Sequence, residues 1–529
     1  MHLTERRKWY LGFGVILLLI VALLLMVHIS LDWLAFFLII LGAIALYDVK
    51  QTKHSILRNF PILGHMRFIL EFFRPEIQQY FIADDQAERP FDRETRNLVY
   101  QRAKGIDDTL AFGTERNILQ DGYEWVAHSL SPKHVSEVEN RIIVGGPDCK
   151  QPYSASRLNI SAMSYGALSS NAIKALNLGA KLGNFYHNTG EGSLSKHHQQ
   201  GGDIVYQLGT GYFGARGKDG KFSDEIFKKT SRLDFVKMIE IKLSQGAKPA
   251  HGGVLPAAKI TPEIAEIRNV PLDQDVLSPP AHETFSTPLE MCHFIKHLRH
   301  LSEGKPIGFK LCLGKKSEFL SICKAMIETG ITPDFITVDG AEGGTGAAPM
   351  EFTNHIGMPL NDALIFIHNA LKGSGLRDKI KIIASGKIIT GFDMIRKIAL
   401  GADICNSARG MMMSLGCIQS RQCNHNTCPV GVATQNPKLY KALDIDDKKH
   451  RVNRFHQSTV HSFQEIVGAM GLTNPSDLCP SMILRRTSPE TIKQYDEIYT
   501  FLDDGVFLND ATFPEKYKKD WNKAHVAQF

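Results

Sequence analysis

Phe335-Ile-Thr-Val-Asp-Gly-Ala-Glu-Gly-Gly-Thr-Gly346 joins a short apolar run to a glycine-rich turn. Its first residues are β-branched or aromatic, which favours a buried strand, and the glycines that follow Asp339 end that strand. A segment of helical length lies on either side of it. The stretch therefore predicts one strand–turn–helix unit of an α/β protein.

The same pattern occurs eight times between residues 155 and 408. The expected strands are Asn159–Ser164, Asn184–Thr189, Ile204–Leu208, Met238–Ser244, Ile307–Leu313, Phe335–Gly340, Lys381–Gly386 and Ile404–Ala408. Eight strands that alternate with helices predict a (β/α)8 TIM-type barrel, whose site gathers at the C-terminal ends of the strands. Residues 249–280 contain several Pro and Gly, and we expect them to form one long loop over that end.

The composition is that of a globular enzyme, with 43% hydrophobic and 22% charged residues among 529. The 61 basic and 55 acidic residues are interspersed, and the net charge of +6 gives no electrostatic case for a nucleic-acid partner. The nine cysteines are an odd number and three of them crowd together, which does not suit a disulfide framework. A reducing compartment is therefore expected.

The N-terminus contains two apolar segments, Leu11–Val27 and Trp33–Tyr47. As helices they would be roughly 25 and 22 Å long, slightly short of the ~30 Å hydrocarbon layer of a bilayer. They predict a transmembrane helical hairpin, so that residues 1–50 form a two-helix membrane anchor in the lipid of the inner membrane. A cleaved signal peptide is the alternative, but no small-residue cleavage site follows the first segment and a second apolar segment comes at once.

Basic residues predict the orientation of this anchor. They lie before the first segment and after the second, at Arg6, Arg7, Lys8, Lys50, Lys53 and Arg58, whereas the connecting loop carries only Asp32. Because Lys and Arg favour the cytoplasmic side, both ends and the catalytic domain are expected on the cytosolic face of the cytoplasmic membrane.

The rest of the chain divides into three parts. Residues 51–150 are mixed and amphipathic, and we interpret them as an N-terminal extension. Residues 151–440 hold the eight expected strands and form the barrel domain. Residues 441–529 are expected to be a C-terminal helical tail.

Three cysteines lie within Cys417-Ile-Gln-Ser-Arg-Gln-Cys423-Asn-His-Asn-Thr-Cys428, just after the eighth expected strand. Thiolates at this density usually hold a soft metal centre. Because only three are present, a three-iron cluster suits the ligand count better than a four-cysteine centre. The alternatives are a Cys3His zinc site that uses His425, and inert thiols.

Glycine-rich strand ends form a second group of candidates. Glycines there let backbone N–H groups approach a phosphate or a flavin ring without interference from a Cβ atom. Arg409, just after the eighth strand, could add a charge-assisted contact. Simple turn chemistry is the alternative for any one of these loops. The candidate cofactor-binding residues are Asp339, Gly340, Gly343, Gly344, Thr345, Ser385, Gly386, Lys387 and Arg409.

Two lysines lie at the ends of apolar runs, Lys242 in Ile-Glu-Ile-Lys-Leu and Lys310 in Ile-Gly-Phe-Lys-Leu. A cation at the C-terminal end of a barrel strand can stabilise negative charge on a reduced flavin or hold a substrate carboxylate. Both are therefore candidate catalytic residues. Exposure at the surface is the alternative.

Several unusual motifs follow one another along the chain. They are Lys242-Leu-Ser-Gln-Gly-Ala-Lys-Pro, Glu-Ile-Ala-Glu-Ile-Arg268, Ser278-Pro-Pro, Gly343-Gly-Thr-Gly-Ala, and Leu415-Gly-Cys-Ile with Asn426-Thr-Cys-Pro-Val-Gly-Val-Ala-Thr-Gln435. Together, over about residues 100–440, they resemble the FMN-binding synthase domain of glutamate synthase.

The resemblance implies a (β/α)8 barrel with FMN at its mouth and a 3Fe-4S cluster on Cys417, Cys423 and Cys428. In that family, 2-oxoglutarate and ammonia give 2-iminoglutarate, and reduced FMN delivers hydride from N5 to form L-glutamate. A dicarboxylate needs fixed cations, and Arg can bind a carboxylate through two hydrogen bonds. By position, the 2-oxoglutarate carboxylates would meet Gln245, Lys248 and Arg268, and the flavin would meet Met163, Ser164, Lys310 and the glycine loops.

The chain departs from the family pattern at two places. The family stretch Lys-Pro-Gly-Glu-Gly-Gly is replaced by Lys248-Pro-Ala250-His251-Gly-Gly, which puts a titratable base where an acid is usual, beside the expected substrate. His2 stands where the nucleophilic cysteine of an amidotransferase domain would follow the initiator methionine, so glutamine hydrolysis is not expected. No NAD(P)H-binding domain is visible, so electrons are expected from an external partner protein through the cluster.

Two other functions stay open at this stage. A membrane-linked FMN amino acid dehydrogenase would oxidise a related amino acid and pass electrons to quinone, which the apolar N-terminus favours. A non-catalytic electron-transfer or scaffold protein would have kept the cluster alone. The polar residues Gln245, Lys248 and Arg268 argue against a non-catalytic protein, because a protein that binds no substrate does not require them.

Overall fold

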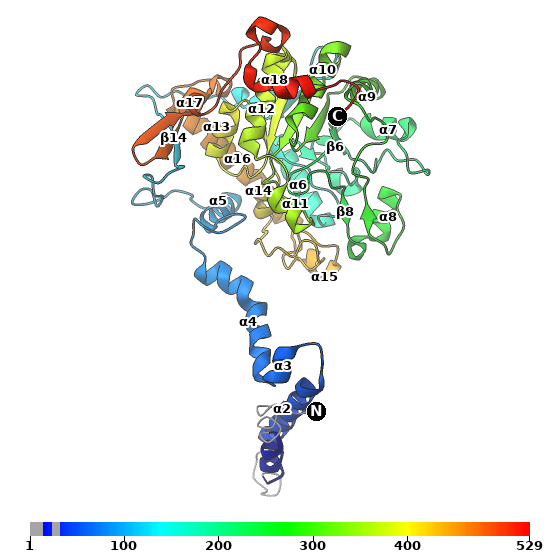
Figure 1. Cartoon of the computed structure of the whole chain (residues 1–529), viewed down its shortest axis with the longest axis vertical. Coiled ribbons are helices and arrows are strands. Elements are labelled where there is room, and N and C mark those ends of the chain that lie inside the picture. Colours follow the sequence, from blue (N-terminus) through cyan, green and yellow to red (C-terminus); the bar gives the residue numbers. More distant parts are fainter. Residues whose placement is uncertain (1–13, 24–31) are drawn as a thin grey trace. The chain divides into compact units, whose positions relative to one another are not determined.

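We analysed a computed structural model, which describes residues 14–23 and 32–529. The chain divides into two compact units, with the boundary between Thr95 and Arg96. Figure 1 shows the N-terminal unit as a few separate helices and the second unit as a barrel surrounded by helices. The structure thus groups residues 96–150 and 441–529 with the barrel.

The N-terminal unit contains one helix that is long and apolar enough to cross a membrane. This is α2 (Asp32–Lys50), whose stretch Trp33–Lys50 has a mean hydropathy of 1.9 and is largely unburied. The second expected apolar segment is therefore a helix. Of the first, Leu11–Val27, only residues 14–23 are described, and they are helical. The described part leaves out the rest of this segment, the connecting loop before Asp32, and the basic residues Arg6, Arg7 and Lys8. The expected hairpin is therefore not established.

Eight parallel strands close into a barrel in the order β10-β11-β12-β13-β4-β5-β6-β7, which confirms the TIM-type fold. Each lies within or beside one of the expected runs. The bounds are β4 Leu158–Ile160, β5 His187–Asn188, β6 Ile204–Leu208, β7 Val236–Lys242, β10 Ile307–Leu311, β11 Phe335–Asp339, β12 Lys381–Ser385 and β13 Ile404–Ser407.

Helices surround this barrel as the alternation of elements requires (Figure 1). They are α6 (Ser170–Gly183), α7 (Asp224–Ser231), α9 (Pro288–Leu301), α10 (Lys316–Thr329), α12 (Leu360–Gly373) and α13 (Gly391–Ala399). Between β5 and β6, a fully described stretch, the chain forms a 3-10 turn, Lys196–His198, in place of an α-helix.

The last helix of the outer layer comes from the expected tail. Helix α16 (Ile445–Ala469) packs against both α6 and α13, and so lies between the first and last helices of the ring. Gly179 permits this contact, because a Cβ atom there would approach Val452 Cγ1 to 2.6 Å. The tail is therefore part of the barrel's own architecture.

The N-terminal end of the barrel is closed by an apolar core. The antiparallel pair β2 (Arg141–Val144) and β3 (Tyr153–Ser156) lies against it. The core is formed by hairpin residues Val144, Tyr153 and Ala155 with Tyr186, Val205, Met238, Phe335, Ile383 and Ile404. Each fully buried aliphatic or aromatic side chain contributes about 1.5–3 kcal/mol. Any site must then lie at the opposite end.

Two segments differ from expectation. The tail is not wholly helical, since β14 (Ile483–Ser488) and β15 (Thr491–Gln494) pair with β1 (Glu124–Val126) in an antiparallel sheet. Residues 249–280 are not one open loop, because they form β8, α8 and β9. The remaining bounds are α3 Ser55–Asn59, α4 Leu63–Ile77, α5 Arg93–Lys104, β8 Val254–Leu255, α8 Pro262–Arg268, β9 Val276–Leu277, α11 Met350–His355, α14 Arg409–Ser414, α15 Pro437–Tyr440, α17 Tyr495–Ile498 and α18 Glu515–Lys523.

Candidate active site

The C-terminal ends of the strands bring the expected polar side chains to one rim. Lys242 ends β7, Asp339 ends β11 and Ser385 ends β12, while Lys310 lies one residue before the end of β10. All four are buried. The lysines are therefore not surface residues, and their ammonium groups need partners inside the protein.

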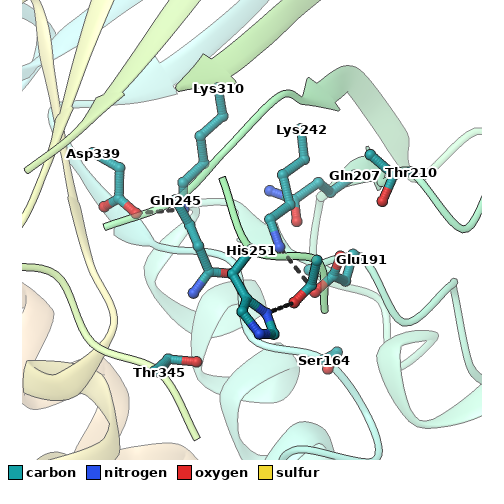
Figure 2. Close-up of polar contacts among 12 residues, drawn as sticks. Ser164, Glu191, Gln207, Thr210, Lys242, Gln245, His251, Lys310, Asp339 and Thr345 are labelled. Atoms are coloured by element: carbon teal, nitrogen blue, oxygen red, sulfur yellow. Dashed lines mark hydrogen bonds and ion pairs between the residues drawn. The ribbon is translucent and has the colours of Figure 1, made fainter. Parts of the chain in front are cut away.

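Lys242 finds its partner in Glu191, on the loop after β5. Their Nζ and Oε1 atoms are 2.8 Å apart, and Figure 2 shows Lys242 pointing toward this carboxylate. Burial alone would raise the pKa of Glu191, but the surrounding cations Lys242, Lys248 and Arg268 lower it below its ordinary value. Glu191 is thus a partly buried carboxylate, 18% exposed, that is held in its charged form.

Two further cations surround the same carboxylate. Lys248 is only 3% exposed, and burial together with the charge of Lys242 lowers its pKa to about 8. Arg268, at the end of α8, is also buried, and its Nη2 donates to the carbonyl of Tyr165 at 2.9 Å. Its guanidinium lies over the Phe213 ring, 5.3 Å from the centroid. Three cations therefore surround one carboxylate.

The loop from Gln245 to Gly253 lies tightly over this group. A Cβ atom on Gly246 would come within 1.9 Å of the Gly340 carbonyl, and one on Gly253 within 2.4 Å of the Glu191 carboxylate. His251 lies beside the Lys242–Glu191 pair in Figure 2, with Nδ1 3.0 Å from the carbonyl of Gly252. The substitution noted in the sequence therefore places an imidazole within the polar group itself.

Lys310 forms a second buried ion pair, with Asp339. Nζ is 3.2 Å from Oδ2, and the same oxygen accepts a hydrogen bond of 2.9 Å from the N–H of Gly246. Burial would lower the pKa of Lys310, but Asp339 and Glu240 raise it above its ordinary value. The ammonium therefore stays protonated, and the pair links β10, β11 and the loop after β7.

Glu240 lies two residues before Lys242 on β7, so both side chains are on the same face of the strand. It lies in the barrel interior and is 1% exposed. Its Oε1 accepts hydrogen bonds from Asn188 Nδ2 at 2.8 Å and Gln207 Nε2 at 2.7 Å, and Oε2 accepts from Thr337 Oγ1. Asn188 is oriented by the Gly190 N–H, which donates to its Oδ1. Glu240 therefore links four strands beneath both ion pairs.

The expected flavin residues after β4 lie against the loop that carries Glu191. Met163 is buried and Ser164 half-buried. Gly190 has φ +62°, and a Cβ atom there would come within 2.9 Å of the Ser164 N. Because only glycine tolerates this conformation and this approach at low cost, the two loops are held together.

The glycine loops after β11 and β12 meet in the same way. The Gly340 N–H donates to the carbonyl of Ser385 at 2.9 Å, and the Gly343 N–H donates to that of Gly340. Gly386 has φ +145° and Lys387 φ +49°. Arg409 donates to the carbonyl of Glu342 and is so close to Gly344 that a Cβ atom there would meet its Nε at 2.8 Å. Thr345 is exposed in this loop.

The three expected cluster ligands lie on one loop after α14. Cys428 is buried, and Cys417 and Cys423 are partly buried. Gln435, at the end of the loop, donates to the carbonyls of Gly166 and Leu168, beside the turn that carries Met163 and Ser164. Among the described residues, however, no three His, Cys, Asp or Glu side chains are gathered so as to hold a metal ion.

Two residues of the site were not singled out from the sequence. Glu191 follows a two-residue strand in Thr-Gly-Glu-Gly, and its neighbouring glycines were the available signal. Glu240 interrupts the apolar run of β7 two positions before Lys242, which marks an inward-facing position. The arrangement as a whole leaves an excess of buried positive charge at the rim, which suits an anionic ligand with two carboxylates.

Known proteins with similar sequences carry the same family domain. Residues 126–473 match the family described as a conserved region in glutamate synthase. The chain is 38% identical to the glutamate synthase large subunit-like protein YerD of Bacillus subtilis, over 87% of this chain and 95% of that protein. It is 32% identical to the archaeal glutamate synthase (NADPH) of Methanocaldococcus jannaschii, over 67% of this chain and 66% of that protein.

The large chain of Bacillus subtilis glutamate synthase (NADPH) is a third relative. It is 30% identical over 387 residues, which is 72% of this chain and 23% of that protein. Residues 126–473, which match the family, include the whole barrel and its closing hairpin, so the family domain covers every strand that contributes to the rim.

Proposed function

The chain belongs to the glutamate synthase family, and on this premise we propose that it reduces 2-oxoglutarate and ammonia to L-glutamate at the barrel mouth. It is an oxidoreductase of the class that acts on CH–NH2 donors. The observation that carries the proposal is the group of Lys242, Lys248 and Arg268 around Glu191. Three cations around one carboxylate give this group a positive charge that suits an anionic substrate.

The reaction consumes 2-oxoglutarate, ammonia, two electrons and two protons, and yields glutamate and water. Ammonia adds to C2 and the carbonyl oxygen leaves as water, which gives 2-iminoglutarate. Arg268 and Lys248 hold the carboxylates and so fix C2 at the rim, where Lys242 and Glu191 face it. FMN, when bound, supplies the hydride that adds to C2. The closely packed 245–253 loop limits access of water to the imine.

The residues present fit FMN in kind. The glycine loops at Gly340–Gly344 and Ser385–Lys387 provide turns that side chains would obstruct, and Arg409 brings a guanidinium to them. Met163 and Ser164 would lie along the ring system, since they adjoin Glu191 through Gly190. Lys310 would stabilise negative charge on the reduced flavin, because its ammonium is held protonated.

We further propose that Cys417, Cys423 and Cys428 bind the 3Fe-4S cluster that passes electrons from an external donor protein. Gln435 ties their loop to the turn before α6 that carries Met163, which supports a short path between cluster and flavin. The three thiols lie near enough to one another that the charges of Cys423 and Cys428 act on Cys417.

The proposal places the enzyme on the cytosolic face of the cytoplasmic membrane, anchored by α2 and by the apolar segment before it. Support comes from the length and apolar character of Trp33–Lys50 and from the basic residues Lys50, Lys53 and Arg58 that follow. The barrel chemistry does not depend on this anchor.

Anaerobic flavin reoxidation tests the central proposal. The detergent-purified protein should show a flavin spectrum and, after oxidation, the EPR signal of a three-iron cluster. Photoreduced protein should then be reoxidised by 2-oxoglutarate plus ammonium, with glutamate formed in equal amount, and by neither reagent alone. A colourless protein, or reoxidation that ignores ammonium, would refute the proposal.

The candidate membrane helix favours a second function, oxidation of an amino acid with transfer of electrons to quinone. The same rim would bind glutamate or a related amino acid, whose hydride passes to the flavin. Reduction of a soluble quinone on addition of glutamate, without 2-oxoglutarate or ammonium, would support this direction. Flavin that stays oxidised in glutamate would rule it out.

A further inference from the structure

Helix α4 (Leu63–Ile77) and the π-helical turn Gln78–Ile82 expose an unusual amount of apolar surface. The exposed fractions range from 48 to 85% for Leu63, Met66, Ile69, Leu70, Phe72, Phe73, Tyr80, Phe81 and Ile82. Soluble proteins rarely expose a contiguous apolar surface of this kind, and such surfaces usually mark a binding face.

The apolar side chains are arranged on one broad side of α4. Met66, Ile69, Leu70, Phe73 and Ile77 follow the spacing of one helical face, and Phe72 widens it. A polar strip beside this face carries Arg67, Glu71 and Arg74, of which the first two form an ion pair of 2.9 Å. The helix is therefore amphipathic, with a polar side that is already satisfied in water.

This helix is fixed to the end of the candidate membrane span. Asp48 of α2 is fully buried, and its carboxylate accepts a hydrogen bond of 2.9 Å from the Ile62 N–H and pairs with His65 Nε2. Ile62 has φ +63°, which turns the chain sharply before α4. Figure 1 accordingly shows α4 leaving at an angle to α2. Helix α4 thus begins where the span ends.

The charge of the segment matches an anionic lipid surface. Residues 50–82 contain five basic residues, at 50, 53, 58, 67 and 74, against two acidic residues, at 71 and 76, so their net charge is +3. Basic residues next to an anionic leaflet contribute about 1 kcal/mol each. Apolar side chains and basic flanks together are the pattern of a helix in the bilayer interface.

We propose that α4 and the turn after it lie on the bilayer, with Ile69, Phe73 and Ile77 at the acyl-chain boundary and Arg67 and Arg74 at anionic phospholipid headgroups. This inference rests on the anchoring of α2 but not on the reaction at the barrel. It assigns the apolar surface to lipid rather than to a second copy of the chain or to the barrel unit.

Photo-crosslinking of the full chain in vesicles tests the inference. p-Benzoylphenylalanine replaces Phe73 on the apolar side or, as the matched control, Glu71 on the polar side. The vesicles contain phosphatidylcholine alone or phosphatidylcholine with phosphatidylglycerol, and flotation first establishes that the chain is bound. We expect several-fold more phospholipid adduct from position 73 than from position 71, with more adduct when phosphatidylglycerol is present.

Each other outcome has a definite meaning. Adducts to a second chain, or to residues beyond 95 of the same chain, would overturn the inference and identify the true occupant. Equal lipid adducts from both positions would overturn the assigned orientation. A chain that does not float at all would refute the anchor of the proposed function, whereas a chain that floats without lipid adducts refutes this inference alone.

Discussion

Arg268 is the residue whose removal best separates substrate binding from cofactor binding. Its buried guanidinium contacts Tyr165 O and the Phe213 ring and faces Glu191. Loss of a charged hydrogen bond costs about 1.5–3 kcal/mol. Arg268→Ala should therefore raise KM for 2-oxoglutarate by roughly tenfold to a hundredfold while flavin content is unchanged.

Arg216 provides the control for this experiment, because its guanidinium lies over the same Phe213 ring, 5.9 Å from the centroid. Arg216→Ala should leave KM within about twofold. An unchanged KM in Arg268→Ala, or equal effects in the two variants, would remove Arg268 from the substrate site.

The lowered pKa of Lys248 leads us to expect that the affinity for 2-oxoglutarate depends on pH. Burial lowers its pKa to about 8, so the ammonium is present below that pH and is lost as pH rises through it. The affinity of the oxidised enzyme for 2-oxoglutarate, titrated by flavin absorbance without ammonium, should therefore weaken above pH 8. Lys248→Arg should abolish this dependence, because a guanidinium stays charged there. A dependence that persists unchanged in Lys248→Arg would assign it to another group.

Substitution of the buried Glu240 is expected to lower the stability of the fold. Its two oxygens accept three hydrogen bonds in the barrel interior, and an amide in its place would turn a donor toward one of them. Glu240→Gln should lower the free energy of unfolding by about 1–3 kcal/mol in urea titrations. The exposed Glu328 is the control, and Glu328→Gln should change it by less than about 0.5 kcal/mol. Equal stability of the two variants would contradict the role of this carboxylate.

Single residues at strand ends were predictable, but their partners were not. Lys242 and Lys310 lie at the ends of apolar runs, so their position at the C-terminal ends of the expected strands already placed them at the rim. Glu191 lies fifty-one positions before Lys242, on the loop after β5, and their pairing depends on barrel closure. No local pattern encodes such a contact. The same holds for Glu240, whose three donors come from β5, β6 and β11.

Strands were predicted better than the segments between them, because burial on both faces leaves a continuous apolar run. The expected Ile204–Leu208 has the bounds of β6, whereas β5 is only His187–Asn188. Asn184 explains that difference, since it adopts a left-handed conformation and ends α6 instead of starting a strand. The role of α16 was not readable, because a helix pattern does not reveal which neighbour it packs against.

Substitution of one thiol on the cysteine loop is expected to remove the cluster without removing the flavin. Cys423 is one of three thiols on a loop that Gln435 ties to the barrel, and Cys423→Ala leaves that tie in place. The variant should lose the cluster, and with it reduction by the external donor, while FMN remains bound. Iron analysis and EPR should show the loss, and photoreduction should still reduce the flavin. Loss of flavin with retention of iron would contradict the assignment.

The division of the chain at Thr95 and Arg96 separates the candidate membrane span from the rim of the barrel. Every side chain of the rim belongs to the second unit, and the one described helix that is long and apolar enough to cross a membrane belongs to the first. A chain that starts at Arg93 keeps α5 whole, since this helix begins there. In a vesicle flotation gradient this shortened chain should stay in the bottom fractions, whereas the full chain should float with the vesicles.

The shortened chain should also keep ammonium-dependent reoxidation of photoreduced flavin within about threefold of the full chain, because no rim contact is removed. Reduction by a membrane-bound donor, by contrast, should fall sharply, since the local concentration that the anchor provides is lost. If the shortened chain still floats, attachment resides in the second unit and α2 is not the anchor. If it loses the soluble reaction as well, the two units cooperate in the chemistry.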